Sequence, residues 1–188
     1  MRRSELLGLK FENIDFDEEK IYIKEKILYD SKEGRFKSDK TLKTDKSRRT
    51  MPFQPGVAEL FRNRQKRIAE NKAKYGNAYN NEFDGYVWVD DLGNLYKPQQ
   101  LTKVVPEICR KIGIKEINLH GLRHSCATIL LQSGANMKVV QDWLGHANYK
   151  TTADTYSHVE FETKRQAVKR LAKYKGELGA KINDQTGE

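Results

Sequence analysis

The chain has 188 residues, of which 37% are hydrophobic and 32% are charged, and this composition favours a folded domain over a disordered chain. It has no apolar run near the roughly 18 residues that a membrane span needs, and its N-terminus lacks the features of a signal peptide. We therefore expect a cytoplasmic protein without a membrane partner. The net charge of +9 favours a polyanionic partner such as nucleic acid.

The N-terminal quarter of the chain predicts one short helix and one small sheet. The helix covers residues 2–10 and places Arg2 on the same face as Leu6 and Leu9. The sheet covers residues 20–53, where isoleucines begin a period-2 pattern and two turns separate three antiparallel strands. An arginine on an apolar helix face is unusual, because charged residues normally lie opposite such a face.

Helices predominate in the rest of the chain. One is predicted from Pro55 to Gly76, since proline favours the first turn and glycine ends a helix. A short hairpin is predicted over residues 86–96. The helix that follows, 98–113, is expected to kink or split at Pro106.

The next helix carries an unusual group of polar residues at its start. Asn118 is the predicted N-cap and Gly134 the predicted stop. His120, Arg123 and His124 are expected to point largely away from its apolar face, where they would bind an anion beside the helix N-terminus. Two histidines four residues apart also suit a metal, but we find no third ligand nearby and disfavour that alternative. The predicted apolar face consists of Leu122, Cys126, Ile129 and Leu130.

Three further helices complete the prediction. Residues 137–146 place Met137, Val140 and Leu144 inward. A short helix with a capping box at Thr151 carries Tyr156, and a basic helix follows over residues 162–177. Cys109 and Cys126 are expected to be free core thiols, since neither has the spacing of a metal or redox motif. The predicted fold class is mainly α with a small three-stranded antiparallel β-sheet.

Five short motifs in this order resemble the catalytic domain of the tyrosine recombinases, or phage-type integrases. They are RRSELLGL, KTDKSRRTMPF, HGLRH, LGH and a TY pair ten residues after that histidine. The resemblance covers residues 2–160 and is strongest to integrases of conjugative transposons and Gram-positive phages. It implies the fold of that catalytic domain without the helices that precede the first arginine.

The resemblance also implies six catalytic residues and no cofactor or metal. Lys43 corresponds to the family's hairpin lysine, although Lys40 and Lys46 compete for that role. Glu5 is expected to orient a basic side chain of the site. The implied catalytic residues are Arg2, Lys43, His120, Arg123, His146 and Tyr156.

The implied reaction is site-specific recombination of double-stranded DNA. Tyr156 attacks a phosphodiester and forms a 3′-phosphotyrosyl bond, which is later religated. The physical chemistry agrees, because two guanidiniums can stabilise the extra negative charge on the non-bridging oxygens of the reacting phosphate. A phenol with a pKa near 10 needs a base, and His120 is the expected one. Lys43 would be the general acid, and His146 would donate to a phosphate oxygen.

The expected domain organisation is a catalytic domain at 1–178 and a flexible tail at 179–188, with the N-terminal DNA-clamping domain of the family absent. The C-terminal segment is expected to support self-assembly as a tetramer on DNA. Two other functions stay open: an inactive DNA-binding remnant or regulator of a full-length integrase, and a relaxing enzyme of the type IB topoisomerase kind. The expected location is the bacterial nucleoid.

Overall fold

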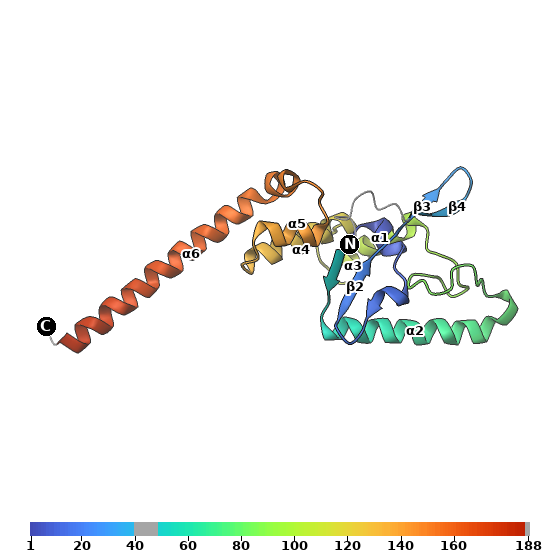
Figure 1. Cartoon of the computed structure of the whole chain (residues 1–188), viewed down its shortest axis with the longest axis horizontal. Coiled ribbons are helices and arrows are strands. Elements are labelled where there is room, and N and C mark those ends of the chain that lie inside the picture. Colours follow the sequence, from blue (N-terminus) through green and yellow to red (C-terminus); the bar gives the residue numbers. More distant parts are fainter. Residues whose placement is uncertain (40–48, 187–188) are drawn as a thin grey trace.

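The computed structural model describes residues 1–39 and 49–186, with side chains up to Leu171 except at 160, 167 and 170. The described chain forms a body of helices and small sheets, from which one long helix projects (Figure 1). No helix among the described residues is long and apolar enough to cross a membrane.

The N-terminal half of the body holds helix α1 and two antiparallel sheets. α1 covers Arg3–Leu7, and a 3₁₀ turn over Phe11–Asn13 leads into the first strand. The first sheet has the order β1-β2-β5 and the second pairs β3 with β4. The strands are β1 (Ile14–Asp15), β2 (Lys20–Ile23), β3 (Lys26–Asp30), β4 (Arg35–Asp39) and β5 (Arg49–Pro52).

The strand membership differs from the sequence prediction, although the fold class is confirmed. The predicted first strand divides at Lys24 and Glu25 into β2 and β3, which belong to different sheets. Glu25 is buried, and its carboxylate accepts a hydrogen bond from Ser38 at 2.9 Å and pairs with Lys10 at 3.0 Å. A buried carboxylate needs such partners. The contacts of Glu25 accompany the break between β2 and β3, where the alternating pattern alone predicts one continuous strand.

Helix α2 (Pro55–Tyr75) lies along one side of the body and has the predicted bounds (Figure 1). Its Arg64 donates to the carbonyl of Val87 at 2.9 Å and also to that of Val89. The predicted hairpin is present as a tight turn closed by the single antiparallel bridge between Val89 and Leu95. The core between the first sheet and α2 includes Leu9, Ile14, Ile21, Ile23, Met51, Phe61 and Val87.

Helix α3 (Pro98–Lys111) is unbroken at Pro106, so of the predicted kink or split the split is wrong. An interior proline removes one hydrogen bond and crowds the carbonyl four residues before it, and the packing of the face that carries Cys109 against the body offsets this cost. Val104 and Ile108, which the periodicity included, are exposed.

Helices α4 (Leu119–Gln132) and α5 (Met137–Leu144) pack with α6 to form a second core. Asn118 caps α4 as predicted, accepting from the Gly121 N–H at 2.7 Å. The predicted face of α4 is wrong in part, because Leu122 and Ile129 are exposed. The residues that form this core are Ala127, Leu131, Met137, Val140, Leu144, Tyr156 and Val159.

The rotated face of α4 changes where its polar residues lie. His120, His124, Ala127 and Leu131 follow the i, i+4, i+7, i+11 spacing of one helix stripe. His120 and His124 therefore lie on the same face of α4 as the buried residues that pack against α5 and α6. The prediction that they point away from the buried face is wrong.

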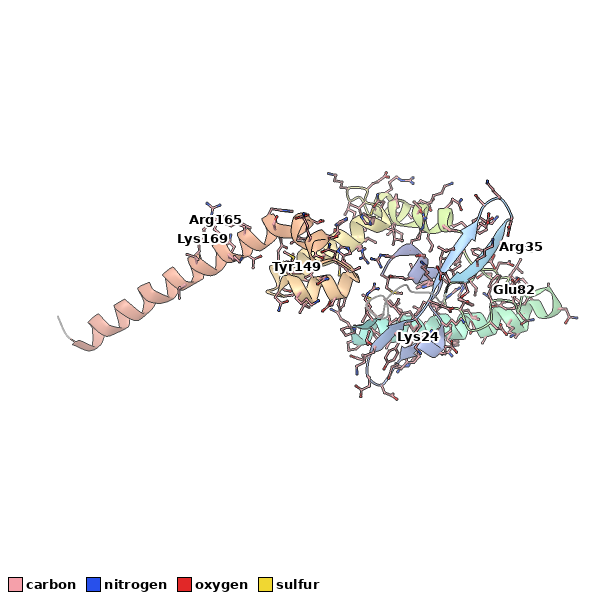
Figure 2. The ribbon with its side chains drawn as sticks, turned by 45° about the horizontal axis from the view of Figure 1, so that its top comes forward. Lys24, Arg35, Glu82, Tyr149, Arg165 and Lys169 are labelled. Atoms are coloured by element: carbon pink, nitrogen blue, oxygen red, sulfur yellow. The ribbon has the colours of Figure 1, made fainter. Side chains whose placement is uncertain are left out.

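Helix α6 covers Tyr149–Thr186 without interruption. The predicted short helix and basic helix are one element, since the Thr151 capping box lies inside it. Figure 2 shows Tyr149 beside the body where α6 begins, and Arg165 and Lys169 on the part that projects. The predicted division of the chain at residue 178 stays a prediction. Both cysteines are free.

Candidate active site

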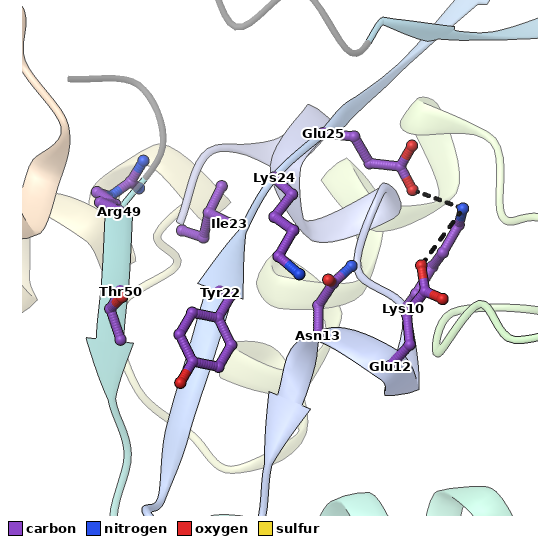
Figure 3. Close-up of a pocket in the computed structure, with 9 residues that line it drawn as sticks. All are labelled: Lys10, Glu12, Asn13, Tyr22, Ile23, Lys24, Glu25, Arg49 and Thr50. Atoms are coloured by element: carbon purple, nitrogen blue, oxygen red, sulfur yellow. Dashed lines mark ion pairs between the residues drawn. The ribbon is translucent and has the colours of Figure 1, made fainter. Parts of the chain in front are cut away.

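Two cavities are each lined by three lysines or arginines of the described chain, and they differ in how these cations are paired. The larger, of about 610 Å³, lies over β2 and β5 and contains Glu12 and Glu25 beside Lys10 and Lys24 (Figure 3). Lys10 is paired with both carboxylates, at 3.0 Å to Glu25 and 4.0 Å to Glu12. Arg49, which also lines it, is paired with Glu5 at 2.9 Å. With two of its three cations neutralised, this cavity is a poorer site for an anion than one lined by no carboxylate.

The smaller cavity, of about 420 Å³, brings together four of the six predicted catalytic residues. It lies between the start of α1, α3, the start of α4 and the segment that follows α5. No carboxylate is among the described residues that line it. The predicted residues that line this cavity are Arg2, His120, Arg123 and His146.

Three arginines bind the C-terminal end of α5. The last carbonyls of a helix have no partner within it, and here each of three successive carbonyls accepts from a guanidinium. Arg49 Nε donates to the carbonyl of residue 143 at 3.1 Å, Arg123 to that of residue 144, and Arg2 Nη2 to that of residue 145 at 2.7 Å. This arrangement fixes strand β5, α4 and α1 to the segment that carries His146.

Glu5 holds two of these arginines in place. Its carboxylate takes two hydrogen bonds from Arg49, at 2.9 and 3.1 Å, and one from Arg2 Nη1 at 3.1 Å. Burial alone would raise the pKa of Glu5, but the hydrogen bonds and charge of Arg49, followed by those of Arg2, lower this pKa to about 2. Glu5 is therefore an ionised counter-charge at neutral pH, and its predicted orienting role has a geometric basis.

Arg123 retains a donor that faces no protein acceptor. Its Nη1 is buried and has no hydrogen-bond partner within the part of the chain that the structure describes. Burial and the charge of Arg2 lower the pKa of Arg123 to about 10, so the guanidinium is still charged at pH 7. A buried charged donor without a partner is costly, and an anion in the cavity would offset that cost.

His146 is neutral and held by two contacts. Its Nδ1 lies 2.9 Å from Thr152 Oγ1, and its carbonyl accepts from Gln141 Nε2 at 2.9 Å. Burial, followed by the charges of Arg123 and Arg2, lowers the pKa of His146 to about 4. When the Thr152 hydroxyl donates to Nδ1, the imidazole proton is on Nε2 and can be donated to a ligand.

Tyr156 is separated from this cavity by one side chain. It is 3% exposed and is not among the described residues that line the cavity. Its hydroxyl lies 2.6 Å from His124 Nδ1, and His124 Nε2 lies 2.7 Å from His120 Nε2. The structure thus places the predicted nucleophile beside the cavity and in contact with His124, which is not among the six residues that the resemblance implies as catalytic. The remaining predicted residue, Lys43, and its alternatives Lys40 and Lys46 lie outside the described residues.

Comparison with known proteins identifies the family. Residues 1–163 match the model of the phage integrase family. The chain belongs to this family.

The relatives of this phage integrase domain include recombinases and integrases. A tyrosine recombinase XerC-like protein of Caldanaerobacter subterraneus subsp. tengcongensis is 34% identical over 178 residues, which are 91% of this chain and 46% of that protein. The integrase of Staphylococcus phage L54a is 25% identical over 92% of this chain and 48% of its own length. The chain therefore spans about half the length of these curated relatives.

A solved structure supports the same assignment. The Tn1549 transposon integrase in complex with transposon right end DNA has a TM-score of 0.69 at 25% identity, and covers 92% of this chain and 55% of its own. The mainly helical fold with small antiparallel sheets is thus that of an integrase catalytic domain.

Sequence reasoning missed three residues that organise this integrase site. Arg49, Gln141 and Thr152 contact the segment that carries His146 or its neighbours. The signal for Arg49 was its place in the motif KTDKSRRTMPF, within the predicted sheet. Gln141 and Thr152 gave no signal, because a polar residue in a helix is usually exposed.

Proposed function

We propose that this chain is the catalytic part of a site-specific DNA recombinase. One observation carries the proposal: Arg2, His120, Arg123 and His146 line a single cavity, and a buried guanidinium nitrogen of Arg123 has no partner among the described residues. Such a cavity suits the non-bridging oxygens of a phosphodiester, since guanidiniums bind them through charge-assisted hydrogen bonds.

The proposed reaction uses these groups in defined roles. Arg2 and Arg123 bind the two non-bridging oxygens and stabilise the negative charge that grows on them. His146 donates its Nε2 proton to the same phosphate. Tyr156 gives up its phenol proton towards His120, attacks phosphorus and forms a 3′-phosphotyrosyl bond. The bond from phosphorus to the 5′ oxygen breaks, and that oxygen leaves with a proton from Lys43.

Religation reverses the step. A 5′ hydroxyl attacks the phosphotyrosine, returns a proton to Lys43 and releases the phenol. No nucleotide is consumed, because the phosphodiester is exchanged for a phosphoester of similar energy. Double-stranded DNA is the proposed partner, with self-assembly through α6 and action at the bacterial nucleoid as further parts of this proposal.

The experiment traps the covalent intermediate. A pool of nicked duplexes of random sequence, in which the cleaved strand loses a short fragment, is incubated with the chain and resolved on a denaturing gel. The N-terminal part of the Caldanaerobacter relative is added in trans in a parallel reaction. We expect a protein–DNA adduct that is absent in Tyr156→Phe, and sequencing of the trapped DNA should return a preferred site.

The other outcomes assign the function differently. DNA binding without an adduct in either reaction would support the inactive remnant, for which the burial of Tyr156 is the favouring observation. An adduct without sequence preference would support a relaxing enzyme of the topoisomerase kind. Either result would refute site-specific recombination.

A further inference from the structure

Three side chains form a continuous row from the core to the cavity. Tyr156 is buried, His124 is half-buried and His120 is exposed at the cavity wall. The Tyr156 hydroxyl lies 2.6 Å from His124 Nδ1, and the two imidazoles meet Nε2 to Nε2 at 2.7 Å. Both separations are short hydrogen-bond distances.

The helix geometry explains why the row is straight. His120 and His124 are one turn apart on α4, with ring centroids 4.3 Å apart and ring planes nearly perpendicular. Tyr156 comes from α6, which packs against α4 through Ala127 and Leu131. The row therefore depends on the packing of two elements and was not visible as a motif in the sequence.

The protons of the row can be placed in two directions. In one, the phenol donates to His124 Nδ1, His124 donates from Nε2 to His120 Nε2, and His120 carries its proton on Nδ1. In the other, every bond is reversed and the phenol accepts. Only the first direction moves the phenol's proton towards the cavity.

The charges around His124 favour a neutral imidazole that can accept a proton. His120 is in contact with it, and Arg123 and His146 are near enough to interact with it electrostatically, as Cys126 does with Tyr156. Burial, with His120 and Arg123, lowers the pKa of His124, whereas burial raises that of Tyr156 although Arg123 opposes the rise. The phenol thus needs an acceptor in contact with its oxygen to lose its proton at neutral pH.

We propose that His124 is a catalytic residue of this site, the base that takes the proton of Tyr156 and passes it to His120. As the Tyr156 oxygen begins to bond to phosphorus, its O–H bond breaks and the proton moves to His124 Nδ1. His124 releases its Nε2 proton to His120 Nε2 and is neutral again, and His120 becomes an imidazolium at the cavity wall. Religation runs the same transfers backwards. The catalytic role of His124 rests on the proposed function. The direction of the hydrogen bonds from Tyr156 through His124 to His120 does not.

The direction is tested without any DNA. The chain has four histidines, so long-range ¹H–¹⁵N spectra of the labelled protein at pH 7 can assign the tautomer of each. We expect His124 to carry its proton on Nε2 and His120 on Nδ1, and Tyr156→Phe to shift the signals of His124 and leave those of exposed His158 unchanged. A His124 protonated on Nδ1 would overturn the proposal, because that nitrogen could not accept from the phenol.

The catalytic role is tested by the pH dependence of the first cleavage event. His124→Asn keeps an acceptor near the position of Nδ1 but cannot pass a proton on. We expect it to bind DNA as the parent chain does and to cleave at least about 100-fold more slowly at pH 7, within the range of general-base catalysis. The deficit should shrink by about tenfold per pH unit towards pH 9, as hydroxide ionises the phenol instead.

A control separates chemistry from folding. His158→Asn makes the same change at an exposed position of α6 and should leave the rate unchanged at every pH. A deficit in His124→Asn that stays constant from pH 7 to 9 would indicate a purely structural histidine and overturn the proposal. If the parent chain forms no adduct, the proposed function fails, and the tautomers of His120 and His124 still decide the direction of the row.

Discussion

At the scale of single residues, hydrogen-bonded neighbours fix the orientation of the side chains that are predicted to be catalytic. The sequence indicated Arg2, His120, Arg123 and His146, and the structure brings them to one cavity. It gave no indication of Thr152, which is fully buried and bonded to His146. A threonine in a helix is ordinarily unremarkable, so only the fold could reveal that its hydroxyl sets the position of an imidazole proton.

Replacing Thr152 tests that role. In Thr152→Val the side chain keeps its shape and loses the hydroxyl, so His146 Nδ1 has no partner there and the imidazole can turn or change tautomer. The net value of one such hydrogen bond is about 1 kcal/mol, and we expect cleavage to slow by about tenfold or less. Thr152→Ser keeps the hydroxyl and should retain the parent rate in the same adduct assay. Equal rates for the Val and Ser variants would contradict the assignment.

At the scale of elements, local signals predicted the starts of α2, α3 and α4 but not that of α6, and long-range contacts decided the rest. Asn118 and Asn136 cap α4 and α5 with their own side chains, which a sequence motif can announce. The division between β2 and β3 depends on Glu25 reaching Ser38, and the inward face of α4 on His124 reaching Tyr156. Contacts between residues distant in sequence do not change the hydrophobic periodicity, so these two features could not be predicted from the sequence.

The junction between α5 and the arginines gives a prediction at this scale. Gly145 has φ of +64°, and a Cβ there would lie 2.6 Å from Arg49 Nη1. Gly113, with φ of +71°, has no heavy atom within 4 Å of such a Cβ. Both Gly→Ala variants meet the backbone cost of about 1–2 kcal/mol, and Gly145→Ala must also displace Arg49.

We therefore expect Gly145→Ala to lower the Tm further than Gly113→Ala, by at least about 2 °C in calorimetry. Adduct formation should fall only in Gly145→Ala, because Arg49 shares Glu5 with Arg2. If the two variants were equally stable and equally active, the close packing of Arg49 on Gly145 would have no energetic importance.

At the scale of the whole molecule, the ion pairs of Glu5 couple stability to pH. Its pKa is about 2 in the folded chain against an ordinary 4.5, so its contribution is complete above pH 4.5 and is lost as pH falls through about 2. The difference corresponds to roughly 3 kcal/mol. Because Glu5 joins α1 to β5, this loss affects the contact between the N-terminus and the sheet.

The variant Glu5→Gln should lack this contribution. We expect urea unfolding at pH 7 to give a free energy roughly 3 kcal/mol below that of the parent, and the gap should close as pH falls from 4.5 towards 2. Glu12→Gln, which alters an exposed carboxylate, should follow the parent at every pH. A gap of the same size at pH 7 and pH 2 would show that Glu5 acts by packing and not by charge.

The length of α6 has a mechanical consequence for Tyr156. The phenol is attached in the second turn of a rod whose remaining part, up to Thr186, extends about 45 Å. A stiff rod acts as a lever, and its short arm carries the hydroxyl beside His124. A small sideways force at the C-terminal end of α6 therefore produces a larger force at the phenol. A partner bound at that end would change the position of Tyr156 without entering the cavity.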